Sequence, residues 1–155
     1  VAYITGTALY NRMGLTTQIP KSIKISSRTK RITVSIGSLK ATPVKSYVDV
    51  TDKNFYLLEL LDALKDFKQI PDLDKESAIK IITNRLQELN ITEIKQLITY
   101  SLAYPPRARS MLGALLEKLN TSASLIELKE SLNPFSSYNL GVGTILPTAK
   151  NWNIQ

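Results

Sequence analysis

The sequence predicts an α+β fold, because the spacing of its apolar residues changes once along the chain. Within residues 21–26 and again within 32–36, apolar and polar side chains alternate, which is typical of β-strands with one solvent-facing side. From Thr51 onward the apolar residues recur every three or four positions, as they do in helices. The length suits one domain with a hydrophobic core. We therefore expect residues 1–155 to form a single domain, with a basic helix-and-sheet part (1–50) and a mainly helical part (51–155).

The basic part is expected to begin with a short helix. Thr5 or Thr7 can cap a helix that continues to Arg12 and Met13, and Gly14 suits the position after its end. Three strands are expected to follow, over 21–26, 32–36 and 44–50, with polar turns between them. They predict a small antiparallel sheet with one apolar face and one face that carries the basic residues.

About five helices are expected to back this sheet, each with an apolar stripe and a recognisable start. The expected start signals are Asp52, Asp74, Asn90 with Glu93, Pro105 with Pro106, and Ser124 with Glu127. Gly113 interrupts the fourth helix, so we expect another element to pack closely there. After Pro134 the chain is expected to be irregular or β, with Trp152 anchoring it on the core.

Composition narrows the chemistry that the chain can perform. Cysteine and histidine are both absent, which excludes disulfides, Cys/His zinc sites and nucleophile pairs that need histidine. We therefore expect a protein that is not an enzyme and has no metal or cofactor, in a reducing cytoplasm. No apolar run approaches the roughly 20 residues that span a bilayer. The Gly141–Gly143 pair lacks the strand, helix and lysine of a phosphate-binding loop.

The net charge of +7 lies entirely in the first third of the chain. Residues 1–50 contain eight basic residues and one acidic residue, whereas 51–155 contain twelve of each. Such asymmetry indicates an anionic partner, namely nucleic acid, a membrane surface or an acidic protein, and its plain alternative is a solvated face. Positive side chains of this kind can neutralise phosphates, with an affinity that is salt-sensitive and independent of sequence. The charge pattern by itself predicts contact with an anion and does not decide which one. The candidate nucleic-acid-binding residues are Lys21, Lys24, Arg28, Lys30, Arg31, Lys40 and Lys45.

Two further cations, Arg107 and Arg109, form a weaker candidate site for a partner. They stand at the start of the fourth expected helix, where positive charge opposes the helix dipole. Each is therefore expected to have an anionic neighbour. This is either an internal carboxylate, such as Glu117 or Asp62, or a phosphate or partner acid, and we favour the internal carboxylate.

One enzymatic alternative is a metal-dependent nuclease of the PD-(D/E)xK type. Asp72, Glu93 and Lys95 supply its residue types, and Glu127 with Lys129 repeats the spacing. The two E-x-K triplets, Glu93–Lys95 and Glu127–Lys129, fall in expected helices, where residues two apart do not share a face. A second alternative is a scaffold that dimerises through its helices, which would show an exposed apolar patch.

Two stretches resemble a known family. Ile4–Pro20 is similar to the "G–x–A–L–…–G–L–T–x–Q–(I/V)–P" opening of the effector domain of AbiEi-type antitoxins. Pro106–Glu117 is similar to their "R–x–x–x–L–G–x–L–L–E" helix. Asn133–Ile154 resembles the closing segment of an uncharacterised branch of that group.

The resemblance implies an antitoxin of a bacterial abortive-infection operon. Such a domain antagonises a nucleotidyltransferase-like toxin and assists repression at the operon's promoter. In this family a winged helix-turn-helix usually comes before the effector domain and reads the promoter. No such segment precedes Val1 here, so we expect this chain alone to bind DNA without reading its sequence. The resemblance supplies no catalytic residues.

Overall fold

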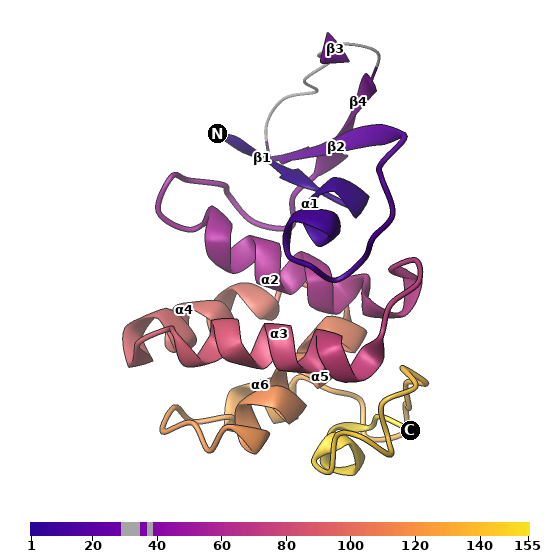
Figure 1. Cartoon of the computed structure of the whole chain (residues 1–155). Helices are drawn as coiled ribbons and strands as arrows, with labels where there is room; N and C mark the ends of the chain where they lie inside the picture. The colour runs from indigo at the N-terminus through magenta and orange to yellow at the C-terminus, as the bar shows by residue number, and fades with distance from the viewer. Residues whose placement is uncertain (29–34, 37–38) are drawn as a thin grey trace.

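The computed structural model describes residues 1–28, 35–36 and 39–155, and its fold is α+β, as the sequence predicts. A small sheet forms one end of the molecule and the helices are layered beyond it, so that the two chain termini lie at opposite ends (Figure 1). No helix in the described ranges is long and apolar enough to cross a bilayer.

The sheet is mixed, which corrects the prediction that it is antiparallel. Its strands are β1 (Ala2–Thr5), β2 (Ser22–Ser27), β3 (Ser35–Ile36) and β4 (Leu39–Lys45), and their order is β1-β2-β4-β3. β1 and β3 run antiparallel to their neighbours, but β2 and β4 run parallel. The apolar opening of the chain supplies the antiparallel partner of β2. Of the strand expected over 32–36, only Ser35 and Ile36 belong to the described residues, and as β3 they pair with β4 rather than with β2.

The third predicted strand is displaced along the sequence. It was expected over 44–50, whereas β4 ends at Lys45. The carboxamide of Asn54 holds the following segment in a loop, because it donates to the Asp49 carbonyl and accepts from the Thr51 amide, each at 2.8 Å. Val50 is buried, but it belongs to this loop rather than to a strand.

The short predicted helix is confirmed as α1 (Thr7–Arg12), although Gly6 rather than a threonine occupies its N-cap position. Its C-terminus forms a Schellman motif. The Gly14 amide donates to the Asn11 carbonyl at 3.0 Å and the Leu15 amide donates to the Tyr10 carbonyl at 2.8 Å. Gly14 adopts the left-handed conformation that this motif needs, with φ of 83°.

The helical part is close to the prediction. It contains α2 (Phe55–Lys65), α3 (Lys75–Gln87), α4 (Ile91–Ser101), α5 (Pro106–Lys118) and α6 (Ile126–Glu130), with a 3₁₀ turn η1 (Phe67–Gln69) after α2. The apolar stripes expected for α2, α4 and α5 are buried, except for Leu119, which lies just after α5 and is half-buried. In α3, Ala78, Ile82 and Leu86 are buried while Ile81 is half-buried.

Two of the predicted helix starts are wrong and three are right. α2 begins after Asn54 rather than Asp52, and α6 begins after Leu125 rather than Ser124. Asp74 occupies the N-cap of α3, and α5 begins at Pro106. The capping box of α4 is complete: Asn90 Oδ1 accepts from the Glu93 amide at 2.9 Å and Glu93 Oε1 accepts from the Asn90 amide at 3.0 Å.

The C-terminal segment is mostly irregular, as predicted, with a parallel bridge between Tyr138 and Ile154 and a 3₁₀ turn η2 (Ala149–Trp152). Trp152 is 2% exposed and lies on α5 at Gly113. A Cβ atom at position 113 would come within 3.0 Å of three ring carbons of Trp152. The close approach predicted from Gly113 is therefore confirmed.

Candidate nucleic-acid interface

The strand register decides on which face of the sheet each lysine lies. Side chains of directly paired residues share a face, and alternate residues of a strand point to opposite faces. Lys24 pairs with Thr42 and with Thr5, so Lys24 and Lys40 lie on the same face as Thr5. Lys45, which pairs with Ser27, lies on the opposite face.

The face that carries Lys24 and Lys40 is turned toward the helices. It also carries Tyr3 and Thr5, whose hydroxyl groups contact Asp62 of α2. The opposite face is largely apolar and includes Ile4, which is exposed. The prediction of one apolar and one polar face is right for these strands. The expectation that the basic residues share a single face is wrong for Lys45, which lies on the apolar face. Lys24 and Lys40 lie on the polar face, and this face meets the helices.

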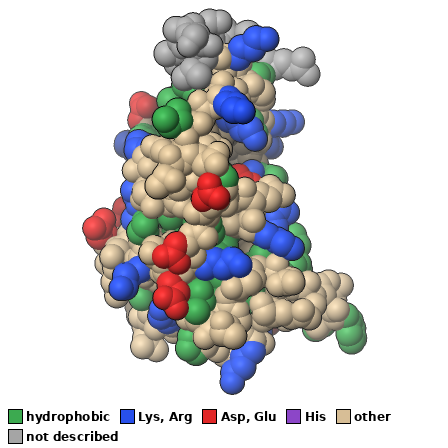
Figure 2. Space-filling view, turned by 45° about the vertical axis from the view of Figure 1, so that its right-hand side comes forward, with side chains coloured by type: hydrophobic (Ala, Val, Ile, Leu, Met, Phe, Trp, Pro, Cys, Tyr) green, Lys and Arg blue, Asp and Glu red, His purple; other side chains and the backbone are tan. Residues whose placement is uncertain are grey.

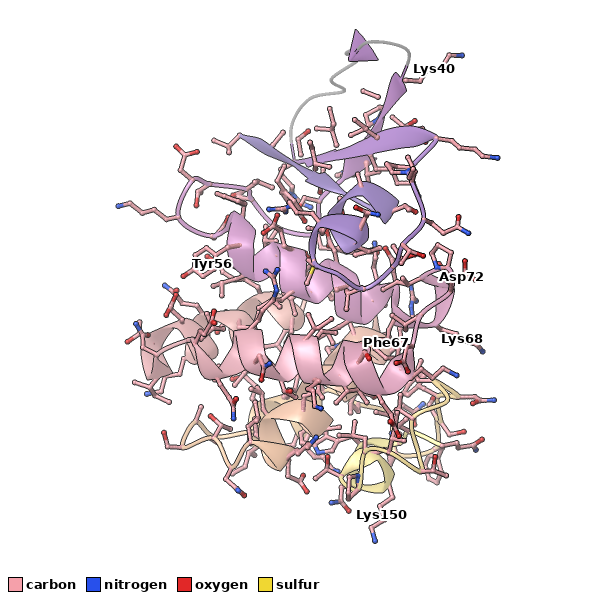
Figure 3. All side chains as sticks on the ribbon, in the orientation of Figure 1. Lys40, Tyr56, Phe67, Lys68, Asp72 and Lys150 are labelled. Atoms are coloured by element: carbon pink, nitrogen blue, oxygen red, sulfur yellow. The ribbon has the colours of Figure 1, made fainter. Side chains whose placement is uncertain are left out.

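Four lysines nevertheless remain open to an anionic partner. We call them the sheet lysines; they are Lys21, Lys24, Lys40 and Lys45. All four are exposed, and among the described residues none has an acidic group within 4.0 Å. Figure 2 shows Lys and Arg side chains spread over the upper, sheet-bearing part of the visible face, and Figure 3 places Lys40 at the tip of the sheet end.

The arginines of the first third are partly used by the fold. Arg12 forms an ion pair with the buried carboxylate of Glu59 on α2. Arg28 Nη1 donates to the carbonyls of Ser46 and Tyr47, at 3.0 and 3.2 Å, and so ties the end of β2 to the loop after β4. Lys30 and Arg31, which belong to the predicted site, lie outside the described residues.

Arg107 and Arg109 have internal partners, but these partners are carbonyls rather than the predicted carboxylates. Arg107 Nε donates to the carbonyl of Lys65, the last residue of α2, at 2.7 Å. Arg109 donates to the carbonyls of Tyr104 and Ser131, and Ser131 is the C-cap of α6. Helix C-termini carry unpaired carbonyls and negative partial charge, which explains the attraction.

The three side chains of the nuclease alternative do not converge. Asp72 accepts from Gln18 after the end of α2, whereas Glu93 accepts from Tyr56 at the start of α2. Figure 3 shows Tyr56 and Asp72 on opposite sides of the molecule. Over the described residues, no group of three acidic side chains is placed to hold a metal ion.

An acidic stripe on α2 is the feature that sequence reasoning missed. Glu59 and Asp62 lie in α2 and Asp66 is its C-cap residue; their spacing of three and four residues places them on one side of the helix. Each binds the N-terminal layer: Glu59 binds Arg12, Asp62 binds Tyr3 and Thr5, and Asp66 accepts from Tyr10. Their spacing within an otherwise apolar helix was the signal available in the sequence.

Asp62 is the centre of this stripe and is 4% exposed. Its Oδ2 accepts from the Tyr3 and Thr5 hydroxyls, each at 2.7 Å, and Tyr104 lies 3.4 Å from Oδ1. Burial raises the pKa of Asp62 above its ordinary value of 3.8, although the hydrogen bonds from Thr5 and Tyr3 and the charge of Lys65 oppose the shift. Burial and the Asp62 charge also raise the pKa of Tyr3 and Tyr104.

The raised pKa predicts how stability depends on pH. A carboxyl group with a higher pKa in the folded state binds more protons there, so its contribution is fully present below the unfolded pKa and is lost as the pH rises through the folded pKa. Relative to Asp62→Asn, the wild-type protein should therefore lose free energy of unfolding as the pH rises from about 4. Urea denaturation of both proteins at a series of pH values from about 4 upward measures the two free energies of unfolding. A wild-type protein that gains stability relative to Asp62→Asn as the pH rises would contradict the assignment.

These observations define the chain as an α+β domain in which a basic sheet layer is joined to a helical layer by an acidic stripe. No family model, no curated protein and no solved structure matches it. The resemblance to AbiEi-type antitoxins therefore stays a prediction.

Proposed function

We propose that this chain is a regulatory domain of the antitoxin type that binds the phosphate backbone of duplex DNA through the sheet lysines. The observation that carries the proposal is their position: they are exposed on the sheet layer and have no ion pair with any described residue, while the helical part is electrically neutral. Lysines placed in this way neutralise phosphates without reading bases. The proposal extends to a nucleotidyltransferase-like toxin as the protein partner, which rests on the resemblance alone.

The antitoxin-like stretches have packing roles in this fold. Gly14 ends α1, Gly113 accommodates Trp152, and Glu117 accepts the Trp152 indole N–H at 2.7 Å. None of these residues contributes to the sheet lysines. DNA binding is therefore supported by the charge distribution, independently of the resemblance.

Replacing all four sheet lysines with glutamine should weaken duplex binding equally on unrelated sequences. The salt dependence should flatten as well, because the slope of log K against log salt falls by about 0.9 for each phosphate that the protein no longer neutralises. Fluorescence anisotropy with labelled duplexes, titrated at several salt concentrations, measures both effects.

The matched control removes the same charge from the helical part. Lys68, Lys80, Lys95 and Lys150 are exposed, and their replacement with glutamine should leave the slope nearly unchanged. Equal losses of affinity in the two variants would assign the binding to net charge and refute a sheet site. Unchanged affinity in the sheet variant would refute it as well.

A further inference from the structure

The strand β1 lies at an edge of the sheet, since the strand order is β1-β2-β4-β3. Its Ala2–Thr5 backbone pairs with β2 on one side only. Along the other side, no described segment forms a backbone hydrogen bond with it. β1 also lacks the lysine, proline or bulge with which edge strands usually avoid pairing with another chain. A row of main-chain donors and acceptors is therefore available there.

A groove of about 440 Å³ runs along this open side. One wall is β1 itself, and the others come from α1 and from the start of α2. The lining residues that matter here are Ile4, Ala8, Arg12, Asp52, Phe55 and Glu59. Because residues on both faces of β1 contribute to the lining, the groove follows the edge of the strand rather than one face of the sheet.

The chemistry of the groove selects its occupant. Ala8 and Phe55 offer an apolar surface at which an inward-pointing side chain can be buried. Arg12 and Glu59 neutralise each other in an ion pair, which leaves Asp52 as the charged side chain of the lining that has no ion pair with a described residue. A cationic side chain near Asp52 would complement it.

We infer that the groove binds an extended peptide segment of a protein partner, which adds to β1 as a further strand. Main-chain hydrogen bonds to β1 provide the affinity, while an apolar side chain at Ala8 and Phe55 and a cationic one at Asp52 provide the selectivity. A second copy of β1 is a poorer occupant, because Ala2–Thr5 contains no cationic side chain for Asp52. This surface is separate from the sheet lysines and independent of DNA binding.

The test uses the isotope-labelled chain and an octapeptide that alternates valine and threonine between terminal lysines, with blocked ends. Amide NMR shifts should move at Ala2–Thr5 and at Ala8 and Phe55. Absence of shifts on β1 up to about 1 mM peptide overturns the proposal. A concentration-dependent dimer without peptide, mapped to the same amides, overturns it in favour of self-association.

Two methylated peptides separate strand addition from simple apolar binding. All valine amides of an extended peptide point to one edge and all threonine amides to the other. N-methylation of one set should weaken binding at least about tenfold, because donors to β1 are removed, while methylation of the other set should preserve it. Equal affinities of the two methylated peptides overturn strand addition.

A groove-filling variant gives an independent check. Ala8→Trp should weaken binding of the unmodified peptide at least about tenfold, since the added ring occupies the apolar surface. Ala103→Trp, at an exposed position beyond α4, is the matched control and should bind normally. Undiminished binding to Ala8→Trp overturns the proposed position of the peptide.

Discussion

Asp62→Ala is expected to lower the free energy of unfolding by about 3–5 kcal/mol. The reason is the loss of a shared acceptor rather than the loss of a charge. Tyr3 and Thr5 donate to Asp62 from β1, and both buried hydroxyls would lose this acceptor. Urea denaturation followed by circular dichroism measures the effect. Asp52→Ala, at an exposed acid, is the control and should change stability by less than about 0.5 kcal/mol.

A second set of variants distinguishes this explanation from a general intolerance of the site. Asp62→Asn keeps one acceptor oxygen and should cost less than Asp62→Ala. Asp62→Leu combined with Tyr3→Phe and Thr5→Val removes the acceptor together with the two hydroxyl groups that lie 2.7 Å from it. Because an apolar group of similar shape avoids both desolvation and unpaired hydroxyls, this triple variant should recover much of the loss. A triple variant less stable than Asp62→Ala would contradict the explanation.

Trp152→Ala is expected to destabilise the protein by about 3–5 kcal/mol, the usual cost of removing a buried aromatic side chain. The ring packs on α5 at Gly113, and its indole N–H donates to Glu117. The neighbouring Gly113→Ala should also destabilise the wild-type protein, because the added methyl group would overlap the ring. Thermal or urea denaturation of the single and double variants measures these costs.

The pair of substitutions should show a reversal of sign. When Trp152 is alanine, the ring that forbids a side chain at position 113 is gone. Gly113→Ala should then stabilise the helix by up to about 1 kcal/mol, which is the difference in helix propensity. The double variant should thus be more stable than Trp152→Ala alone. Additive losses of stability would show that the glycine is required for a reason other than this packing.

The agreement between sequence and structure is best in the helical part. The apolar stripes of α2, α4 and α5 and the capping box of Asn90 and Glu93 were all predicted. Periodicity and capping depend on residues within one or two turns of each other, so the sequence displays them directly. Gly113 was equally informative, because a glycine inside a helix indicates a close neighbour, although the sequence did not name Trp152.

The sheet and the candidate sites were predicted less well. The charge excess indicated the sheet lysines, but their division between two faces depends on the register of β2 with β4. The edge groove depends on β1 being a strand at all, and only its pairing with β2 reveals that. A four-residue apolar stretch is too short for its period to distinguish a strand from a helix.

The fold class, most helix positions and the location of the charge follow from the amino-acid sequence, because each is a property of neighbouring residues or of composition. Three features needed the folded chain: β2 and β4 are parallel, Arg107 and Arg109 bind carbonyls, and the polar face of the sheet meets an acidic stripe on α2. These features join residues that are distant in the chain. Which donor meets which acceptor follows from how the layers pack, and a one-residue change of strand register would reverse every face.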